Sequence, residues 1–388
     1  MKFLKKTLDE LGMDFLLSRD HQGGNILHRL FQVRRKQSRL QSINVYEFII
    51  PALEICPFLI CQTDSSGDTP LHVLEKCRTN IFLEFRRIDQ NGMFLDPEIN
   101  KDEELTVNMF NNYFKKAQEM AGTEEFYHPP WRVKNEKGNT PLHEAVLATD
   151  IDMVRELLNL EKELAGYVNN SDETPLHLLS KSNFNSVLWT RENETIIINK
   201  SHSAVYMRDK DGLTPFLRAA RDGNLRLLEL LGVHHPQVGI RDYSGKTFWH
   251  LLADRAAIKD QYHDLLEAPV MQLLDVERND SKQFQTLYLA DNDGNTPLHL
   301  AIKNNHFKLA QLFLEYPVPR PEILYTPNMK GVKPRDLIAA AQHLPADVSS
   351  YVVVAACMHF LVIHSYYIIA VPLSVDRHLI LFSLRFTV

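Results

Sequence analysis

The sequence has few of the features that mark an active site or a metal site. Its 388 residues include only four cysteines, and none of them forms a C-x-x-C pair: Cys56, Cys61, Cys77 and Cys357. This scarcity excludes a disulfide-rich secreted scaffold and is typical of a reducing compartment. The chain also has no nucleophile-elbow serine and no signature of a kinase, a deaminase or a zinc protease. The sequence therefore predicts neither an enzyme nor a cofactor.

The chain also lacks an excess of positive charge and a targeting segment. Its formal net charge is -6 at pH 7, which gives no general attraction to nucleic acid. We interpret the one compact basic run of the first half, residues 34–39, as a solvated helix face. Residues 1–17 carry acidic side chains within the stretch that a signal peptide would keep apolar. We predict no signal peptide and expect the chain to start in the cytosol.

One triplet, Gly245-Lys246-Thr247, resembles the end of a phosphate-binding loop. Such a loop needs a further glycine, with four residues between it and the triplet, so that backbone N–H groups curl around an anion. Position 240 is Ile, so the pattern fails. We expect no nucleotide site here and no small-molecule substrate.

The triplet belongs instead to a nine-residue frame that occurs eight times. The frame starts with Asp or Asn, has Gly three residues later, and reads DNDGNTPLH in one well-kept copy, residues 291–299. Seven copies keep the glycine, and the exception has Asp172. The copies end at His28, His72, His143, His177, Leu217, His250, His299 and Asp336, which are 44, 71, 34, 40, 33, 49 and 37 residues apart.

The frame has a physical explanation as a turn that leads into a helix. Asp or Asn followed by Gly suits a tight turn, because Gly accepts a positive φ. Thr140-Pro141 and Thr296-Pro297 then open a helix, since Thr caps N–H groups and Pro tolerates the first helical position. Residues 151–161 have apolar side chains at helical spacing, which predicts a second helix that packs on its neighbours.

The period and the T-P-L-H-x-A wording resemble the ankyrin repeat over residues 20–345. The resemblance implies an all-α fold, a curved ankyrin-repeat solenoid of helix-turn-helix repeats with β-turn tips. It implies protein partners that bind the turn tips and the concave face, and a histidine that bonds to the turn and to the Thr of its repeat. Because these histidines lie in different repeats, they cannot converge on one ion, and we predict no metal site.

The spacing also suggests the domain boundaries. The 71-residue gap is close to twice the period, and it either holds one degenerate repeat, with its helix at residues 107–120, or is a simple insertion. We expect an N-terminal cap at 1–19, the array at 20–345 with insertions near 85–130, 188–204 and 255–285, an apolar segment at 348–375 and a tail at 376–388.

The C-terminal region contains a long stretch without charge. Residues 348–375 include no Asp, Glu, Lys or Arg, and about 20 apolar residues are enough to cross a bilayer. We favour a membrane segment, with the repeats on the cytosolic side of the plasma membrane or an endomembrane. The alternative is a soluble cytoplasmic binding module, in which this β-branched stretch packs on the last repeat.

The order and wording of the repeats resemble a narrower family, the plant ankyrin-repeat membrane proteins of the accelerated-cell-death type. The resemblance is carried by VKNEKGNTPLHEAV, ELAGYVNNSDETPLHLL, MRDKDGLTPFLRAA and ADNDGNTPLHLA. It implies a membrane-tethered adaptor in plant defence, cell-death or stress signalling. Members of that family continue into several membrane helices with a Pro-Gly-Gly element, which does not follow here. We therefore interpret the membrane domain as truncated.

Residues that flank the turns are predicted to contact the partner. Turn tips are exposed in such repeats, whereas the Thr, Pro, Leu and His positions serve folding, and Tyr and Arg dominate interface energies. Trp249 takes the Leu position of its frame, so we expect it to be buried in the stack. The predicted contact residues are Lys134, Arg208, Lys210, Arg241 and Tyr243.

Overall fold

The fold consists of helices joined by turns. A computed structural model describes residues 13–36, 46–74, 76, 107–121, 128–181, 191–234, 239–254, 270–273, 286–315 and 321–340. Every regular element in these ranges is a helix, which confirms the predicted all-α class. The chain divides into two compact units, Met1–Phe248 and Trp249–Val388, which we call unit 1 and unit 2 and describe separately.

The predicted membrane segment, residues 348–375, lies outside the described residues. Within the described part of the chain, no helix combines the length and the apolar character that a membrane crossing requires.

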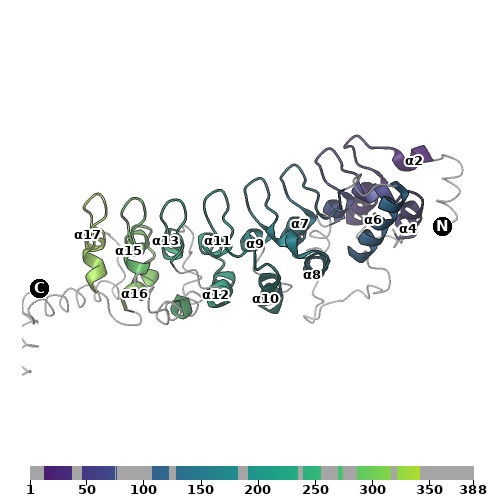
Figure 1. Cartoon of the computed structure of the whole chain (residues 1–388). Helices are drawn as coiled ribbons and strands as arrows, with labels where there is room; N and C mark the ends of the chain where they lie inside the picture. The colour runs from purple at the N-terminus through teal and green to yellow at the C-terminus, as the bar shows by residue number, and fades with distance from the viewer. Residues whose placement is uncertain are drawn as a thin grey trace, which may run out of the picture. The chain divides into compact units, whose positions relative to one another are not determined.

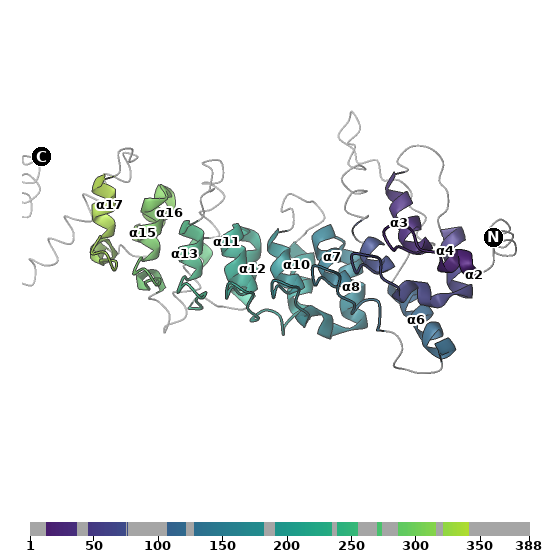
Figure 2. The same cartoon turned by 90° about the horizontal axis from the view of Figure 1, so that it is seen from above.

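Unit 1 contains helix pairs that follow one another (Figure 1). The first helices α7, α9 and α11 pack in succession, and the second helices α8, α10 and α12 lie on the side away from the turns. Figure 2 shows the same pairs from the turn side. The elements are α2 (Met13–Leu17), α3 (Ile26–Lys36), α4 (Tyr46–Ile55), η1 (Pro57–Cys61), α6 (Val107–Ala121), α7 (Pro141–Ala148), α8 (Ile151–Leu160), η3 (Lys162–Gly166), α9 (Pro175–Leu178), η4 (Leu179–Lys181), α10 (Arg191–Lys200), α11 (Pro215–Asp222) and α12 (Leu225–His234).

Unit 2 repeats the same arrangement. Its α15 packs against both α16 and α17. The helix α13 (Phe248–Asp254) begins at the boundary between the units, and the other elements are η6 (Thr286–Tyr288), α15 (Pro297–Lys303), α16 (Phe307–Glu315), η7 (Pro321–Tyr325) and α17 (Pro334–Ala340).

The pair α7 and α8 shows how the sequence sets the limits of each helix. Thr140 precedes α7 in an extended conformation, and Pro141 occupies the first helical position, where a missing N–H is no loss. The helix ends at Thr149, whose φ of 59° is left-handed. Asp150 then caps α8, because its carboxylate accepts the Met153 N–H at 3.0 Å. The predicted Thr-Pro helix start is confirmed.

Buried apolar side chains join successive helices within each unit. In unit 1, the rings of Phe216 and Phe248 lie 5.1 Å apart between centroids, and both are fully buried. In unit 2, Trp249 is 0% exposed and meets Phe313 edge-on at 5.3 Å, which confirms its predicted burial. A single repeat has too little core to be stable, so contacts between neighbours supply most of the stability.

The 71-residue gap in the repeat spacing is an insertion within one repeat. His72 Nε2 donates to the carbonyl of Asn139 at 3.0 Å, and the Glu136 N–H donates to the carbonyl of Ser66 at 2.9 Å. The turns before and after the gap are thus direct neighbours, with no further turn between them. The helix expected in the gap is present as α6, and it packs against η1 and α8 as a second helix does.

The segment near 188–204, expected as an insertion, contains the second helix of its repeat. Residues 191–200 form α10, which packs against α8 and α12. Its Glu194 accepts a hydrogen bond from Arg226 of α12 at 2.8 Å. The apolar residues of this helix, at positions 196–198, are consecutive and not three or four positions apart, which is why the sequence did not indicate it.

Candidate protein-binding surface

Each turn is closed by its first side chain. In the turn at 135–139, Asn135 Oδ1 accepts the N–H groups of Lys137 and Asn139, both at 3.0 Å, and Gly138 N–H donates to the Asn135 carbonyl at 2.8 Å. A short polar side chain therefore satisfies backbone donors that would otherwise need water. The same side-chain bonds occur in all eight copies, which begin at Asp20, Asp64, Asn135, Asn169, Asp209, Asp242, Asp291 and Asn328.

Two features of the turn favour glycine at its fourth position. Its φ is positive in all seven copies, as at Gly138 with 74°, and Asp172 takes the same conformation at 57°. A Cβ on Gly138 would also lie only 2.5 Å from the backbone nitrogen of Asn170 in the next turn. The glycine therefore allows both the turn and the close approach of its neighbour.

Neighbouring turns are joined by backbone hydrogen bonds. In each case the second residue of one turn donates its N–H to the carbonyl of the third residue of the preceding turn. The bonds in unit 1 are Ser65 to Gln22 at 2.8 Å, Glu136 to Ser66 at 2.9 Å, Asn170 to Lys137 at 3.0 Å, Lys210 to Ser171 at 3.1 Å and Tyr243 to Asp211 at 3.4 Å. In unit 2, Met329 donates to Asp293 at 3.2 Å.

The repeated histidines fasten each repeat to the following turn. His143 Nδ1 accepts the Thr140 N–H at 3.1 Å and lies 2.8 Å from Thr140 Oγ1, so Nε2 carries the ring proton. Nε2 donates that proton to the carbonyl of Glu173, 3.1 Å away in the next turn. The bond to Thr confirms the role that the resemblance implies. Equivalent Nε2 bonds to the next turn are made by His28, His72, His177, His250 and His299.

Burial lowers the pKa of five of these histidines. Loss of hydration is the largest cause, and it lowers the pKa of His143 to about 4. The neutral ring is thus the form that joins the repeats, because a proton on Nδ1 would face the Thr N–H. The same cause lowers the pKa of His28, His72, His177 and His299.

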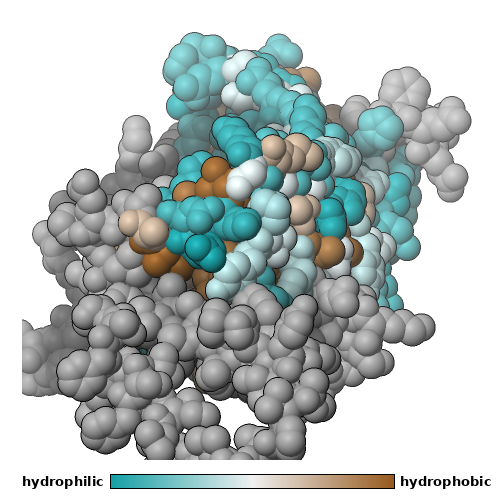
Figure 3. All heavy atoms as spheres, turned by 90° about the vertical axis from the view of Figure 1, so that its left-hand side faces the viewer, coloured by the Kyte–Doolittle hydropathy of each residue, from teal (hydrophilic) through white to brown (hydrophobic). Residues whose placement is uncertain are grey.

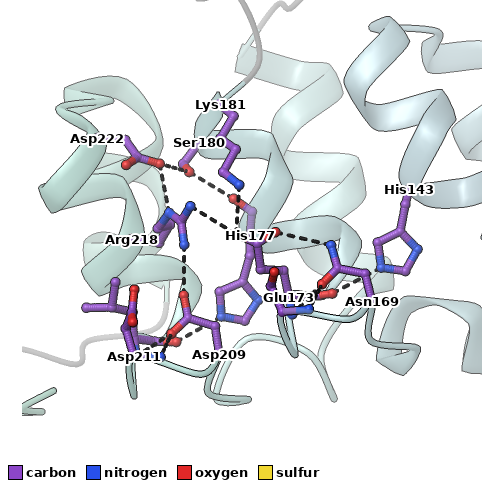
Figure 4. Close-up of polar contacts among 12 residues, drawn as sticks. His143, Asn169, Glu173, His177, Ser180, Lys181, Asp209, Asp211, Arg218 and Asp222 are labelled. Carbon is purple, nitrogen blue, oxygen red and sulfur yellow. Dashed lines mark hydrogen bonds and ion pairs between the residues drawn. The ribbon is translucent and has the colours of Figure 1, made fainter. Parts of the chain in front are cut away.

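A buried ionic cluster adds a second link between two repeats of unit 1 (Figure 4). Arg218 is 7% exposed, and its guanidinium contacts three carboxylates, those of Glu173 and Asp209 at 2.9 Å and that of Asp222 at 3.0 Å. Lys181 also pairs with Glu173 at 2.8 Å. These cations lower the pKa of Glu173, against a desolvation that by itself would raise it.

A chain of polar contacts extends from this cluster to earlier repeats. Asn169 Nδ2 bridges Glu173 Oε2 and Asn139 Oδ1, both at 3.1 Å. Asn139 in turn donates to Glu144 at 2.9 Å, and Asn135 joins Glu144 to the turn before it. The first residue of a turn and the residue after its glycine therefore form one connected network across neighbouring repeats.

Two of the predicted contact residues are bound to the following repeat. Lys134 Nζ donates to the carbonyl of Val168 at 2.6 Å, and Arg208 donates to the carbonyl of Arg241 at 2.7 Å. Arg19 makes the equivalent bond at 2.7 Å to the next repeat. All three directly precede the first residue of a turn. A cation at this position therefore forms a second link between repeats, and its recurrence is visible in the sequence.

The other predicted residues lie on the outer edge of the turns. Lys210, Arg241 and Tyr243 are exposed, and Tyr243 retains 67% of its accessible surface. The Tyr243 ring lies so close to Gly212 that a Cβ there would be 2.6 Å from Cγ of the ring. Lys137, an exposed lysine at the tip of the turn at 135–139, was not among the predicted residues. Its position in the frame, directly before the turn glycine, is the one sequence feature that marks it as exposed.

Sequence comparison agrees with this geometry. The family model described as "Ankyrin repeat" matches residues 137–166 and 293–319. The chain carries ankyrin repeats. Such repeats serve as protein-binding modules, and each matched range begins within a turn and covers the helix pair that follows it, one pair in each unit.

One similar solved structure is the ankyrin repeat domain of Bcl-3, described as a unique member of the IkappaB protein family. It shares 16% sequence identity with this chain at a TM-score of 0.44, covering 70% of this chain and 94% of that one. At this level of similarity, the assignment of ankyrin repeats rests on the family match and the turn geometry.

Proposed function

We propose that this protein is a non-enzymatic scaffold that binds protein partners through the turns of unit 1. The observation that supports it is the contrast within each turn: the first side chain bonds inward to its own backbone, and the next two residues are exposed at the tip. Lys210 and Tyr243 occupy such tip positions on neighbouring turns. Their side chains can meet a partner without loss of the bonds that hold the turns together.

The turns of unit 1 are also ordered before any partner binds. Backbone bonds join each tip to the next, and the cations Lys134 and Arg208 fix the base of their turns. A surface that is ordered in advance loses little conformational entropy on binding, which favours affinity. Figure 3 shows that hydrophilic residues cover much of the upper part of the molecule when it is viewed from the α17 side.

A photo-crosslinking residue placed at Tyr243 tests this proposal. The control position is Asp152, at the exposed start of α8, on the side away from the turns. We expect defined protein adducts from the Tyr243 position in cells and far fewer from Asp152. Equal labelling at both positions would reject the turns as the binding surface.

We further propose that residues 348–375 attach the scaffold to a membrane, as an adaptor in plant defence, cell-death or stress signalling. The support is the uncharged stretch itself, together with the resemblance of the repeats to the accelerated-cell-death family. Detergent-dependent extraction of the full chain from a membrane pellet is the expected result. A monodisperse monomer in buffer without detergent would support the soluble alternative instead.

A further inference from the structure

We propose that the tips of four consecutive turns in unit 1 bind an extended, carboxylate-rich segment of a protein partner. This inference rests on the proposed function and assigns the chemistry of the partner. We call this surface the turn edge, and it comprises the exposed side chains on and directly before the turns at 135–139, 169–173, 209–213 and 242–246.

Cations outnumber carboxylates on the turn edge. The exposed carboxylates are Glu136, Asp172 and Asp211, and Asp211 is already paired with Arg221 at 2.6 Å. The chain as a whole has a net charge of -6, so this positive charge is local. The cations are Lys134, Lys137, Arg208, Lys210 and Arg241, which are exposed, and Lys246, which is partly exposed.

The acids that begin the turns do not cancel this charge at the surface. Asp209 Oδ1 accepts the N–H groups of Asp211 and Leu213 at 3.0 and 2.9 Å, and its other oxygen pairs with buried Arg218. Asp242 Oδ1 likewise accepts two N–H groups of its own turn, at 2.9 and 2.8 Å. These carboxylates point into the turns, whereas the Lys137 and Lys210 side chains are exposed.

The spacing of the charges favours a peptide over a nucleic acid. A nucleic acid carries a negative charge at every nucleotide, so it would also face Glu136 and Asp172. Side chains of an extended peptide alternate between its two faces, so its acids can meet the cations while other residues pass the acids of the turn edge. The exposed ring of Tyr243, packed on Gly212, offers an aromatic contact at one end.

Fluorescence anisotropy of a labelled peptide that mixes Glu with Gly and Ser tests this assignment with the full chain. A neutral Gly-Ser peptide and single-stranded DNA of similar length are the comparison probes. We expect the Glu-containing peptide to bind more tightly than either, and added salt to weaken it because exposed charges are screened. The double variant Lys137→Glu with Lys210→Glu should weaken binding about tenfold, the effect of reversing two contacts at the rim of an interface.

The matched control is Lys303→Glu with Lys330→Glu, two exposed lysines of unit 2, which should leave binding unchanged. If the Lys137 and Lys210 variant melts earlier than the wild type, the milder Lys137→Gln with Lys210→Gln should still weaken binding about threefold. Equal effects of the two lysine pairs, or tighter binding of DNA, would overturn the assignment. If the peptide assignment fails but the crosslinker at Tyr243 still gives protein adducts, the scaffold function stands. If those adducts are also absent, both the peptide assignment and the scaffold function are rejected.

Discussion

Two neighbouring repeats of unit 1 hold their following turns by different groups. In the repeat that begins at Asn169, His177 Nε2 donates to the carbonyl of Leu213 at 2.9 Å. The next repeat has Leu217 in place of the histidine and cannot make that bond. There, Arg208 donates to the carbonyl of Arg241 instead. These two repeats each keep one of the two links, the histidine or the cation, whereas the repeat that begins at Asn135 has both, through His143 and Lys134.

An ionic contact also joins these two repeats to each other. Arg218 of the second repeat pairs with Glu173 of the first, and Lys181 pairs with the same carboxylate. The cluster therefore joins the repeat of Leu217 to the repeat before it. The bond that Leu217 cannot make would reach the turn after it, so the cluster and the missing bond belong to different interfaces.

Removing the centre of that cluster should have the largest effect. In Arg218→Met, the buried carboxylate of Asp209 loses the cation that pairs with it, which typically costs about 3–5 kcal/mol, whereas Glu173 keeps Lys181. Urea unfolding should show this loss. A double variant, Arg218→Met with Asp209→Asn, should recover part of it, and no recovery would contradict the view that Asp209 is the group left unpaired.

Acid should weaken the repeats that depend on histidine. The pKa of His143 is about 4 in the fold and near 6.5 in the unfolded chain, so the unfolded chain takes up the proton first as pH falls. Stability is complete above pH 6.5 and is lost between 6.5 and 4, with about 2 kcal/mol lost at pH 5 from His143 alone. Burial also lowers the pKa of His28, His72, His177 and His299. Urea unfolding at pH 7 and pH 5 measures this, and equal stability at both would reject the neutral links.

Removing the histidine link from the first repeat tests how much that link contributes. His177→Leu gives the first repeat the residue that the second one has. It removes the acceptor of the buried Thr174 N–H and one of the two donors to the Leu213 carbonyl, which keeps the Asp209 N–H at 2.9 Å. A buried donor left unsatisfied in this way costs about 1–3 kcal/mol. The unfolding midpoint in urea should fall accordingly. A change as small as that of Lys303→Ala on the surface of unit 2 would show that the link is dispensable.

The cationic link should have the smallest effect. Arg208 is exposed, so Arg208→Ala should cost about 1 kcal/mol through the lost bonds to the Gly212 and Arg241 carbonyls. Lys210→Ala is the matched control and should cost less than about 0.5 kcal/mol, as ordinary surface changes do. Thermal melting of both variants measures the difference. Equal costs would mean that Arg208 is not a link.

The sequence predicts the local half of this architecture. The turn, its glycine and the Thr-Pro helix start depend on residues within one nine-residue frame, so they recur in register and can be read directly. The burial of Trp249 followed from its place in that frame. The resemblance also supplied the bond between histidine and Thr.

The other half depends on residues far apart in the chain. His72 bonds to the carbonyl of Asn139 across an insertion, and a carbonyl acceptor has no sequence signature, since every residue has one. The same applies to Lys134 and its acceptor, the carbonyl of Val168. For the same reason, the sequence alone leaves open whether the 71-residue gap holds a degenerate repeat or an insertion. The bonds between the turns on either side of the gap are needed to decide it.

The backbone bonds between turns are the central feature of this account, since they support both the stability of the stack and the ordered turn edge. Amide hydrogen exchange at the second residue of each turn tests them directly. The N–H groups of Glu136, Asn170 and Lys210 belong to exposed or tip residues, yet they are bonded to the preceding turn at 2.9, 3.0 and 3.1 Å. They should exchange far more slowly than amides of an unstructured peptide, with Tyr243, bonded at 3.4 Å, faster than these three. Exchange of all four at the unprotected rate would contradict the account.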